Sequence, residues 1–266
     1  MPRSGTSWLG QIFASHPDTR FKLDPLFSYA FKDSLDAESS GADWRELFAN
    51  AYSTADEYMD QDFLRRDGLV PTFDKSPDPS WLVIKAVRRH QLIRNLLEIV
   101  DDLRVVLLVR DPRAMIASWL QHPREFPDGA DPRTEWRSGS CRKTSENEFW
   151  GFDDWLWVTK EFEEISSDSP DRAYLLRYED LLGDTRTAVE SLFSWCGLDL
   201  DPQTTDFLTA GTVHDSRGWS VFKSPEELRS RSLKLDEDVE ASMINEVRMA
   251  GLEHFLDPTL SRAQSP

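Results

Sequence analysis

An uninterrupted apolar run at residues 104–110, RVVLLVR, constrains the fold of this chain more than any other segment. The run is rich in β-branched residues and does not alternate with polar positions, which is the pattern of a parallel strand buried on both faces. Pro112 follows it, where the first turn of a helix tolerates proline, and residues 114–120 continue as a helix. A buried strand that leads at once into a helix predicts a parallel α/β fold.

Short apolar runs alternate with helical patterns along most of the chain. Further strands are expected at residues 19–23, 81–85 and 173–178. Residues 122–147 are polar and rich in Pro, Gly and Arg, and are expected to form a long loop. This order favours a single α/β domain over residues 1–266, with helices on both faces of a parallel sheet. Helices are expected at residues 6–15, 43–52, 55–65, 91–100, 148–165, 185–195, 206–210 and 236–249.

The charge balance narrows the range of partners. The chain has 31 Lys and Arg against 48 Asp and Glu, a formal net charge of −17, which disfavours nucleic acids, anionic membranes and other polyanions as partners. No apolar run of about 18 residues is present, so no transmembrane helix is expected, and the polar first residues do not form a signal peptide. Cys141 and Cys196 are too few for a disulfide framework or a metal cluster. We therefore expect a cytoplasmic location.

Residues 2–9, PRSGTSWL, have the composition of a phosphate-binding loop followed by a helix. Gly5 allows a tight turn and a close approach of the backbone to a ligand. Ser4, Thr6 and Ser7 offer hydroxyl and N–H groups where the positive end of the helix dipole attracts an anion.

Arg3 and Trp8 flank this loop and narrow its ligand. Arg3 adds a forked donor that suits phosphate or sulfate oxygens, and Trp8 adds an aromatic face. An anion site beside an aromatic plane indicates a nucleotide. The loop is not a Walker A motif, because no Lys follows Gly5, and a Ser/Gly/Thr run at a terminus is also compatible with a frayed end.

Chemically distinctive side chains follow the expected strands. The C-terminal ends of parallel strands form the ligand-binding edge of such sheets, and here the runs end in Asp24, Lys85, Arg110 and Tyr178. Ser118 lies about two turns into the helix after Arg110, at roughly 1.5 Å per residue. At this spacing the side chains of Arg110 and Ser118 can bind one phosphate. Taken alone, Ser118 is better explained as a small helix residue bonded to the backbone. The set predicts a site for a multiply charged nucleotide.

Two of these segments resemble the nucleotide-binding motifs of sulfotransferases that use 3′-phosphoadenosine 5′-phosphosulfate (PAPS). Residues 2–9 resemble the 5′-phosphosulfate loop of that family, and residues 109–118 resemble its 3′-phosphate motif, with the same spacing from Arg to Ser. Residues 177–181 are similar to the segment that supplies an adenine-contacting Tyr. The segments that resemble the carbohydrate branch more than the phenol and steroid branch are residues 23–27, 84–88, 193–202 and 212–214.

The resemblance implies a fold, an activity and a set of site residues. The implied fold is a P-loop-like α/β domain. The implied activity is in-line transfer of a sulfuryl group from PAPS to a hydroxyl or amine of a small or carbohydrate acceptor, with PAP as the product. Arg3 and Lys85 are expected to stabilise the transferring group, so no metal is required. The residues expected to bind PAPS are Arg3, Ser4, Gly5, Thr6, Ser7, Trp8, Arg110, Ser118, Tyr178 and Arg217.

The same resemblance points to a catalytic base. The phenol branch has a His two residues after the Lys that matches Lys85, where this chain has Val87. The carbohydrate branch has a Glu at the place of Asp24, so Asp24 is expected to accept the proton of the acceptor. An Asp-Pro turn is the competing explanation for Asp24.

Residues 26–75 and 122–150 are expected to form the acceptor site. Aromatic residues in and near these segments either stack on an acceptor ring or pack in the core. The acidic balance favours a neutral acceptor over a sulfated polymer. The aromatic residues are Trp44, Phe48, Tyr52, Trp136, Trp150 and Trp155.

Two other functions remain open from the sequence. The first is a P-loop nucleotide-dependent kinase that uses ATP, against which the missing Gly-Lys-[Ser/Thr] argues. The second is a truncated, non-catalytic homologue that binds a nucleotide or a partner. Such a loop normally follows a buried strand, and this sequence starts at the loop, so the first strand of the sheet is expected to be missing or truncated.

Overall fold

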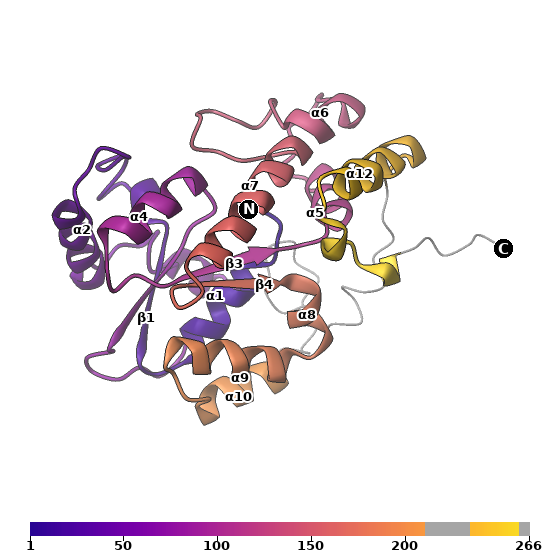
Figure 1. Ribbon diagram of the computed structural model, residues 1–266. Coiled ribbons are helices and arrows are strands. Elements are labelled where there is room, and N and C mark those ends of the chain that lie inside the picture. Colours follow the sequence, from indigo (N-terminus) through magenta and orange to yellow (C-terminus); the bar gives the residue numbers. More distant parts are fainter. Residues whose placement is uncertain (211–234, 261–266) are drawn as a thin grey trace.

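The computed structural model describes residues 1–210 and 235–260 and confirms a parallel α/β fold (Figure 1). The strands of the described residues form two two-stranded parallel sheets, whereas the sequence predicted one sheet. In one sheet β1 (Thr19–Leu23) pairs with β2 (Trp81–Lys85), and in the other β3 (Val105–Val109) pairs with β4 (Ala173–Arg177).

Helices connect and cover the strands (Figure 1). None of the described helices has the length and apolar character needed to span a membrane. Short 3-10 turns lie at Pro25–Phe27, His90–Leu92, Glu253–Phe255 and Pro258–Leu260. The α-helices are α1 (Thr6–Ser15), α2 (Gly41–Ser53), α3 (Asp62–Arg66), α4 (Ile93–Ile99), α5 (Pro112–Leu120), α6 (Pro132–Ser138), α7 (Phe152–Asp168), α8 (Tyr178–Gly183), α9 (Thr185–Cys196), α10 (Pro202–Ala210) and α12 (Glu237–Met249).

Helix α5 starts where the sequence predicts it. Pro112 occupies its first position, and the Asp111 side chain accepts a hydrogen bond from the backbone N–H of Arg113. The Arg113 guanidinium also pairs with the Asp111 carboxylate at 2.6 Å, and both side chains are buried. This cap fixes the turn that links the end of β3 to α5, which is the turn that carries Arg110.

Three segments differ from the sequence-based expectation. Residues 178–183 form α8, which was not expected, so Tyr178 begins a helix instead of ending a strand. The loop expected at residues 122–147 contains α6, because Asp131 accepts a hydrogen bond from the N–H of Arg133 and Gly139 ends the helix in a left-handed conformation. The helix expected at residues 55–65 is reduced to α3, since turns occupy most of the residues before it.

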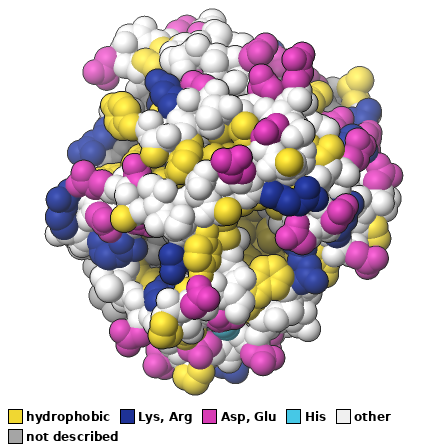
Figure 2. Space-filling view, turned by 90° about the vertical axis from the view of Figure 1, so that its left-hand side faces the viewer, with side chains coloured by type: hydrophobic (Ala, Val, Ile, Leu, Met, Phe, Trp, Pro, Cys, Tyr) yellow, Lys and Arg dark blue, Asp and Glu magenta, His cyan; other side chains and the backbone are white. Residues whose placement is uncertain are grey.

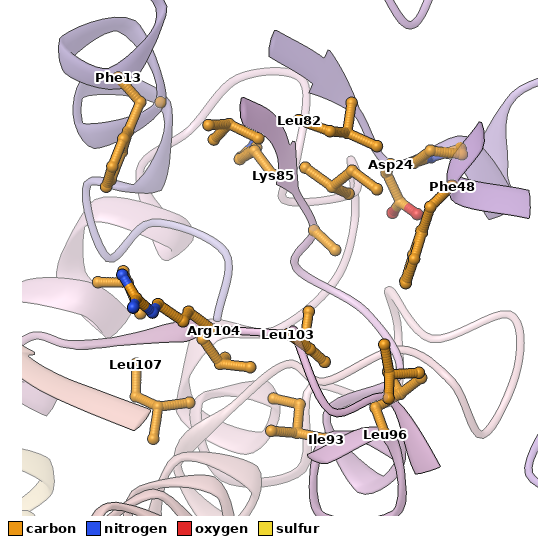
Figure 3. A pocket seen from close by; sticks show the side chains of 18 of the residues that line it. Phe13, Asp24, Phe48, Leu82, Lys85, Ile93, Leu96, Leu103, Arg104 and Leu107 are labelled. Carbon is orange, nitrogen blue, oxygen red and sulfur yellow. The ribbon is translucent and has the colours of Figure 1, made fainter. Parts of the chain in front are cut away.

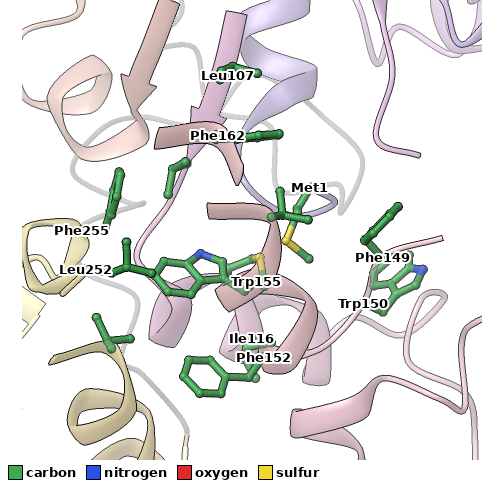
Figure 4. Packing of buried hydrophobic residues seen from close by; sticks show 14 of the residues in the cluster. Met1, Leu107, Ile116, Phe149, Trp150, Phe152, Trp155, Phe162, Leu252 and Phe255 are labelled. Atoms are coloured by element: carbon green, nitrogen blue, oxygen red, sulfur yellow. The ribbon is translucent and has the colours of Figure 1, made fainter. Parts of the chain in front are cut away.

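The strands lie between two apolar layers, and β3 contributes to both. Leu107 and Val109 pack with Trp155 and Phe162 of α7 on one face, the cluster drawn in Figure 4. Leu108 packs on the other face, with residues of α1 and α9. Because both faces of β3 are covered by apolar side chains, the run at residues 104–110 has no polar position in its interior.

Candidate functional site

The phosphate-binding loop is built around Gly5. Its φ of 89° lies in the left-handed region, and α1 begins at the next residue, with the backbone N–H of Leu9 bonded to the Gly5 carbonyl at 3.1 Å. A Cβ at this position would overlap the ring of Tyr178, which is buried against the loop. Gly5 therefore meets both a conformational and a steric requirement.

Replacing Gly5 by Ala is expected to lower the free energy of unfolding by about 3 kcal/mol or more, because a backbone strain of about 1–3 kcal/mol adds to the overlap with Tyr178. Gly129→Ala is the matched control: Gly129 has a similar φ of 83° but nothing within 4 Å of its Cβ position. Urea unfolding of both variants measures the difference. Equal losses in the two variants would show that the Tyr178 contact adds nothing.

The loop and the turn after β3 are joined through Arg3. The Arg3 Nε and Nη2 atoms donate hydrogen bonds to the Ser118 hydroxyl at 3.2 and 3.0 Å. Arg110 Nη1 donates to the Arg3 carbonyl at 2.9 Å, and the Arg110 guanidinium lies 4.6 Å from the centre of the Tyr178 ring. Two segments more than 100 residues apart in sequence therefore form one cationic cluster.

A hydrogen bond from α7 holds the backbone of Arg110, and one hydrogen-bond donor of its side chain has no acceptor among the described residues. Its carbonyl accepts a hydrogen bond from the indole N–H of Trp155 at 2.9 Å, which ties the end of β3 to α7. Its Nε atom is buried and has no hydrogen-bond partner among the described residues. A buried, charged N–H without an acceptor is costly, so the arrangement fits an anion that accepts from Arg110.

Asp24 directly follows β1, and Lys85 is the last residue of β2, at the same edge of that sheet. The register pairs Leu23 with Lys85, and the backbone N–H of Asp24 donates to the Lys85 carbonyl at 2.9 Å. The Asp24 carboxylate is buried and lies 3.4 Å from Arg88 Nη1 and 3.9 Å from Arg89 Nη1. Figure 3 shows Asp24 and Lys85 on the rim of one cavity.

Burial shifts the pKa of both groups toward neutrality. It raises the pKa of Asp24 above its ordinary value, although Arg88, Arg89 and Lys85 oppose this shift. It lowers the pKa of Lys85 to about 8, with the charges of Arg88 and Arg3 acting in the same direction. Lys85 thus lies within electrostatic reach of Asp24 and Arg3.

Two acidic residues belong to this site that the sequence did not single out. Glu125 Oε2 lies 3.3 Å from Arg3 Nη1. The Glu179 carboxylate accepts a hydrogen bond from the backbone N–H of Asp111 at 3.0 Å, and burial raises its pKa to about 7. Glu179 directly follows Tyr178 in a segment that was already of interest, whereas Glu125 lies in a polar loop where no pattern marks it.

The remaining loop residues lie close to this cluster. Ser4 is buried, Thr6 and Ser7 start α1, and the Trp8 ring packs edge-on against Tyr178 with centroids 6.2 Å apart. Arg217 and the segment at residues 212–214 lie outside the described residues. Among the described residues, no group of three His, Cys, Asp or Glu is placed to hold a metal ion.

Most of the aromatic residues considered for the acceptor site are core residues. Trp136, Trp150 and Trp155 are buried in the cluster around α7, so the core alternative is correct for them. Trp44 is buried in a separate cluster against which Phe48 packs. Tyr52, the last of the six aromatic residues considered, donates a hydrogen bond from its hydroxyl to Asp78 Oδ1 at 2.7 Å.

The cationic cluster contrasts with the outer surface. On the face shown in Figure 2, acidic and basic side chains are interspersed between apolar ones. At the strand ends, by contrast, Arg3, Lys85, Arg88 and Arg110 gather around one edge. An acidic chain therefore keeps a locally positive site that suits an anion.

Comparison with known proteins identifies the family. The family model described as "Sulfotransferase family" matches residues 1–202. Carbohydrate sulfotransferase 5 of Mus musculus is 25% identical over 265 residues, which cover 76% of this chain and 63% of that protein. The chain therefore spans less than two thirds of that relative's length.

Solved structures of sulfotransferases are also similar to this chain. A sulfotransferase domain from the curacin biosynthetic pathway aligns with 97% of this chain and 92% of its own, at 14% identity and a TM-score of 0.47. Mouse sulfotransferase SULT7A1 complexed with PAP aligns with 99% of this chain and 82% of its own, at 12% identity and a TM-score of 0.46. Because the sulfotransferase family model matches residues 1–202, the chain belongs to the sulfotransferase family.

Proposed function

We propose that this protein transfers a sulfuryl group from PAPS to a hydroxyl or amine of a small or carbohydrate acceptor and releases PAP. The observation that carries the proposal is the buried Arg110 Nε, which has no acceptor among the described residues and lies beside the Arg3–Ser118 pair. A phosphate at this place accepts from Arg110 and Ser118 together. Membership of the sulfotransferase family supports the same donor.

The residues present fit the two anionic ends of PAPS. Arg110 and Ser118 bind the 3′-phosphate in this proposal. The 5′-phosphosulfate binds the N–H groups of residues 4–7 at the start of α1, where the helix dipole favours an anion. Tyr178 and Trp8 contact the adenine, and Arg217 is proposed as a further phosphate ligand.

In the proposed mechanism PAPS supplies the sulfuryl group and a phosphate leaving group. Arg3 and Lys85 stabilise the negative charge that develops on the transferring group and on the leaving oxygen. Asp24 takes the proton of the acceptor, and its raised pKa brings it closer to neutral pH, where a general base is most effective. These side chains do not need a metal ion to neutralise the developing charge.

Asp24→Asn is expected to reduce kcat by about 10²–10⁴-fold, the usual contribution of a general base. The amide keeps the volume of the side chain but cannot accept a proton. Asp33→Asn is the matched control, because Asp33 also pairs with Arg89 but is largely exposed. Initial rates with saturating PAPS measure the effect, and near-normal turnover of the Asp24 variant would remove Asp24 from this role.

Residues 26–75 and 122–150 are proposed to form the acceptor site around Asp24. Their inner ends meet at Arg88, which lies 3.8 Å from the centre of the Phe27 ring and 3.2 Å from Glu148 Oε1. Arg88 and Glu148 also form an isolated β-bridge. An acceptor bound against Arg88 is thus close to Asp24, whose carboxylate lies 3.4 Å from Arg88 Nη1.

Ligand-induced stabilisation tests the proposed donor. PAP at about 100 times its Kd is expected to raise Tm by roughly 5–10 °C, because binding to the folded state alone contributes about 2.7 kcal/mol. ATP with Mg²⁺ is the control, and a larger shift with ATP would favour a kinase. A PAPS assay over sugars, phenols and small alcohols, with product masses as the readout, then identifies the acceptor class.

A further inference from the structure

The backbone of Asp24 is strained. Its φ of 29° is positive, a conformation that a residue with a Cβ adopts only at a cost. The chain is held there by two hydrogen bonds, from the Asp24 N–H to the Lys85 carbonyl at 2.9 Å and from the Phe27 N–H to the Asp24 carbonyl at 3.0 Å. Strain of this kind persists where the surroundings hold a residue from several sides. The direction of the Asp24 carboxylate therefore depends on its neighbours.

The two oxygens of this carboxylate have different surroundings. Oδ2 accepts a hydrogen bond from Arg88 Nη1 at 3.4 Å. Oδ1 lies 3.9 Å from Arg89 Nη1, which is too far for a hydrogen bond, and accepts none from the described residues. Arg89 is engaged elsewhere, because its Nη2 donates to Asp33 Oδ1 and to the Leu26 carbonyl. Arg88 thus holds one oxygen of Asp24 and leaves the other open.

The Arg88 guanidinium is itself fixed on one edge and on one face. Its Nε donates to Glu148 Oε1 at 3.2 Å, and the backbones of the two residues meet in an antiparallel bridge. The Phe27 ring lies against its face at 3.8 Å and packs in turn on Tyr58, with ring centroids 5.7 Å apart. Only a planar side chain with donors on separate nitrogens can make these contacts together, so Lys is not equivalent here.

Glu148 is the anchor of this arrangement. Its Oε2 accepts hydrogen bonds from the backbone N–H of Thr144 at 2.7 Å and from the Thr144 hydroxyl at 2.8 Å, and the side chain is buried. Although burial acts in the opposite direction, the hydrogen bonds from Thr144 and Arg88 hold the pKa of Glu148 below its ordinary value. Glu148 is therefore ionised and has both oxygens occupied, which suits an anchor better than a base.

We propose that Arg88 is a positioning residue for Asp24, anchored by Glu148, and that it binds one carboxylate oxygen so that the other faces the acceptor. The inference rests on the proposed function, in which Asp24 is the base. Asp24 Oδ1 takes the acceptor proton while the acceptor's bond to sulfur forms and the bond between sulfur and the leaving phosphate oxygen breaks. Arg88 stays charged throughout and acts through Asp24.

The charge of Arg88 also gives the role a pH signature. Burial raises the pKa of Asp24 and lowers that of Lys85, and the charge of Arg88 acts to lower both. Removing that charge raises both pKa values, so both limbs of the pH–activity profile move to higher pH. An arginine with a merely structural role would leave the limbs in place. The charged and titratable groups that face Asp24 are Tyr58, Lys85, Arg88 and Arg89.

Substitutions at Arg88 test the role through kinetics. Arg88→Met is expected to lower kcat by about 100-fold, the cost of misplacing a reacting group, with the KM for PAPS unchanged. Arg88→Lys keeps the charge without the forked donors, so kcat is expected to fall by about 10-fold while the pH profile stays in place. Rates are measured with PAPS and the sugar, phenol or alcohol that gives the most product. Wild-type kcat in either variant would overturn the proposal.

Arg20→Met is the matched control. Arg20 also stacks on an aromatic ring, 4.0 Å from the centre of Tyr52, and lies in β1, the strand that leads to Asp24. It donates to the Tyr52 carbonyl at 2.9 Å rather than to a carboxylate of the site. Its replacement is expected to leave kcat and the pH profile at their wild-type values. Losses equal to those of Arg88→Met would show that any stacked arginine has this effect, which contradicts the proposal.

A double variant tests the anchor. Glu148→Gln cannot accept from both Thr144 and Arg88, so kcat is expected to fall by about 10-fold. In the Arg88→Met background the same change is expected to cause no further loss, because Glu148 acts through Arg88. Losses that multiply in the double variant would contradict this coupling. If Arg88→Met does not fold, Arg88→Lys and Glu148→Gln decide the question: reduced kcat in both supports the proposal, and normal kcat in either opposes it.

Carbon-13 NMR gives a readout that needs no turnover. In protein labelled at the Asp carboxyl carbons, the Asp24 signal is assigned by its absence from Asp24→Asn. Its pKa is expected to be higher in Arg88→Met than in the wild type and unchanged in Arg88→Lys. An unchanged pKa in Arg88→Met would overturn the role of Arg88 at any level of activity. A wild-type protein that transfers no sulfuryl group to any sugar, phenol or alcohol would instead overturn the proposed function.

Discussion

Replacing Lys85 by Met is expected to reduce kcat by about 10²–10³-fold, the range observed when one preorganised donor is removed from a charge-stabilising site. Met retains the apolar stem of the side chain, so the packing against α1 is largely kept. The ammonium is lost from a buried position that lies in the field of Arg3 and Asp24, where water screens a charge poorly. Rates at saturating PAPS and acceptor measure the change.

The pH dependence gives a second readout for Lys85. Because its pKa is lowered to about 8, the wild-type protein is expected to lose activity as the pH rises through about 8, when the ammonium releases its proton. Lys85→Met is expected to lack this part of the pH profile. A variant that keeps both normal turnover and the alkaline decline would contradict the role of Lys85.

Through Lys85, a rise in pH is expected to lower activity but to raise the free energy of unfolding. Unfolded Lys85 has the ordinary pKa of 10.5, whereas folded Lys85 has a pKa of about 8. Between these values the unfolded state binds a proton that the folded state has released, so Lys85 makes the free energy of unfolding increase with pH over this interval. Urea unfolding across the interval is expected to show a smaller increase for Lys85→Met.

Lys75 provides the matched control. Burial also lowers its pKa to about 8, but its ammonium donates to the carbonyl of His16 at 2.9 Å, near the C-terminal end of α1 and away from the cationic cluster. Lys75→Met is therefore expected to change the pH dependence of stability as Lys85→Met does, while kcat stays close to the wild-type value. The comparison separates loss of a buried charge from loss of a catalytic charge.

Arg110→Met is expected to raise the Kd for PAP by about 10–100-fold, because one hydrogen bond to a charged group contributes about 1.5–3 kcal/mol. In the proposed function, Arg110 contributes in two ways. Its unsatisfied Nε is available to the 3′-phosphate, and its Nη1 holds the carbonyl of Arg3 and hence the backbone of the loop. Isothermal titration with PAP measures the loss.

Arg104→Met is the control at the opposite end of the same strand. Arg104 is exposed, donates to the carbonyls of Trp195 and Cys196, and lies far along β3 from the loop. Its replacement is expected to leave PAP affinity unchanged. Adenosine 5′-phosphosulfate, which lacks the 3′-phosphate, separates the two contributions of Arg110: a variant that loses equal affinity for both nucleotides would show that Arg110 acts on the loop alone.

Local structure in this protein is largely predictable from its sequence. The bounds of α1, β1 and β2 agree with expectation because each apolar segment has a clear stop signal, such as His16-Pro17 after α1. Helix α6 was missed although Asp131 and Gly139 are ordinary helix-end signals, since the many Pro, Gly and Arg residues around it favoured a loop.

Contacts between distant segments are the part that the sequence did not predict. Arg3 was assigned to the transferring sulfuryl group and Ser118 to the 3′-phosphate, and their direct hydrogen bond depends on how two loops meet across the strand ends. The pairing of Glu125 with Arg3 is of the same kind. The division into two sheets also follows from tertiary pairing, which no single strand pattern encodes. The single-domain organisation and the cytoplasmic location stay predictions.

The position of Tyr178 limits how the nucleotide preference of this protein can be engineered. Its ring lies against Gly5 on one side and beneath the Arg110 guanidinium on another, so the residue proposed to recognise the base also shapes both phosphate sites. A substitution at Tyr178 chosen to admit a different base would also weaken the binding of every phosphate. A change of donor specificity in this scaffold therefore requires compensating substitutions around Gly5 and Arg110, introduced together with the one at Tyr178.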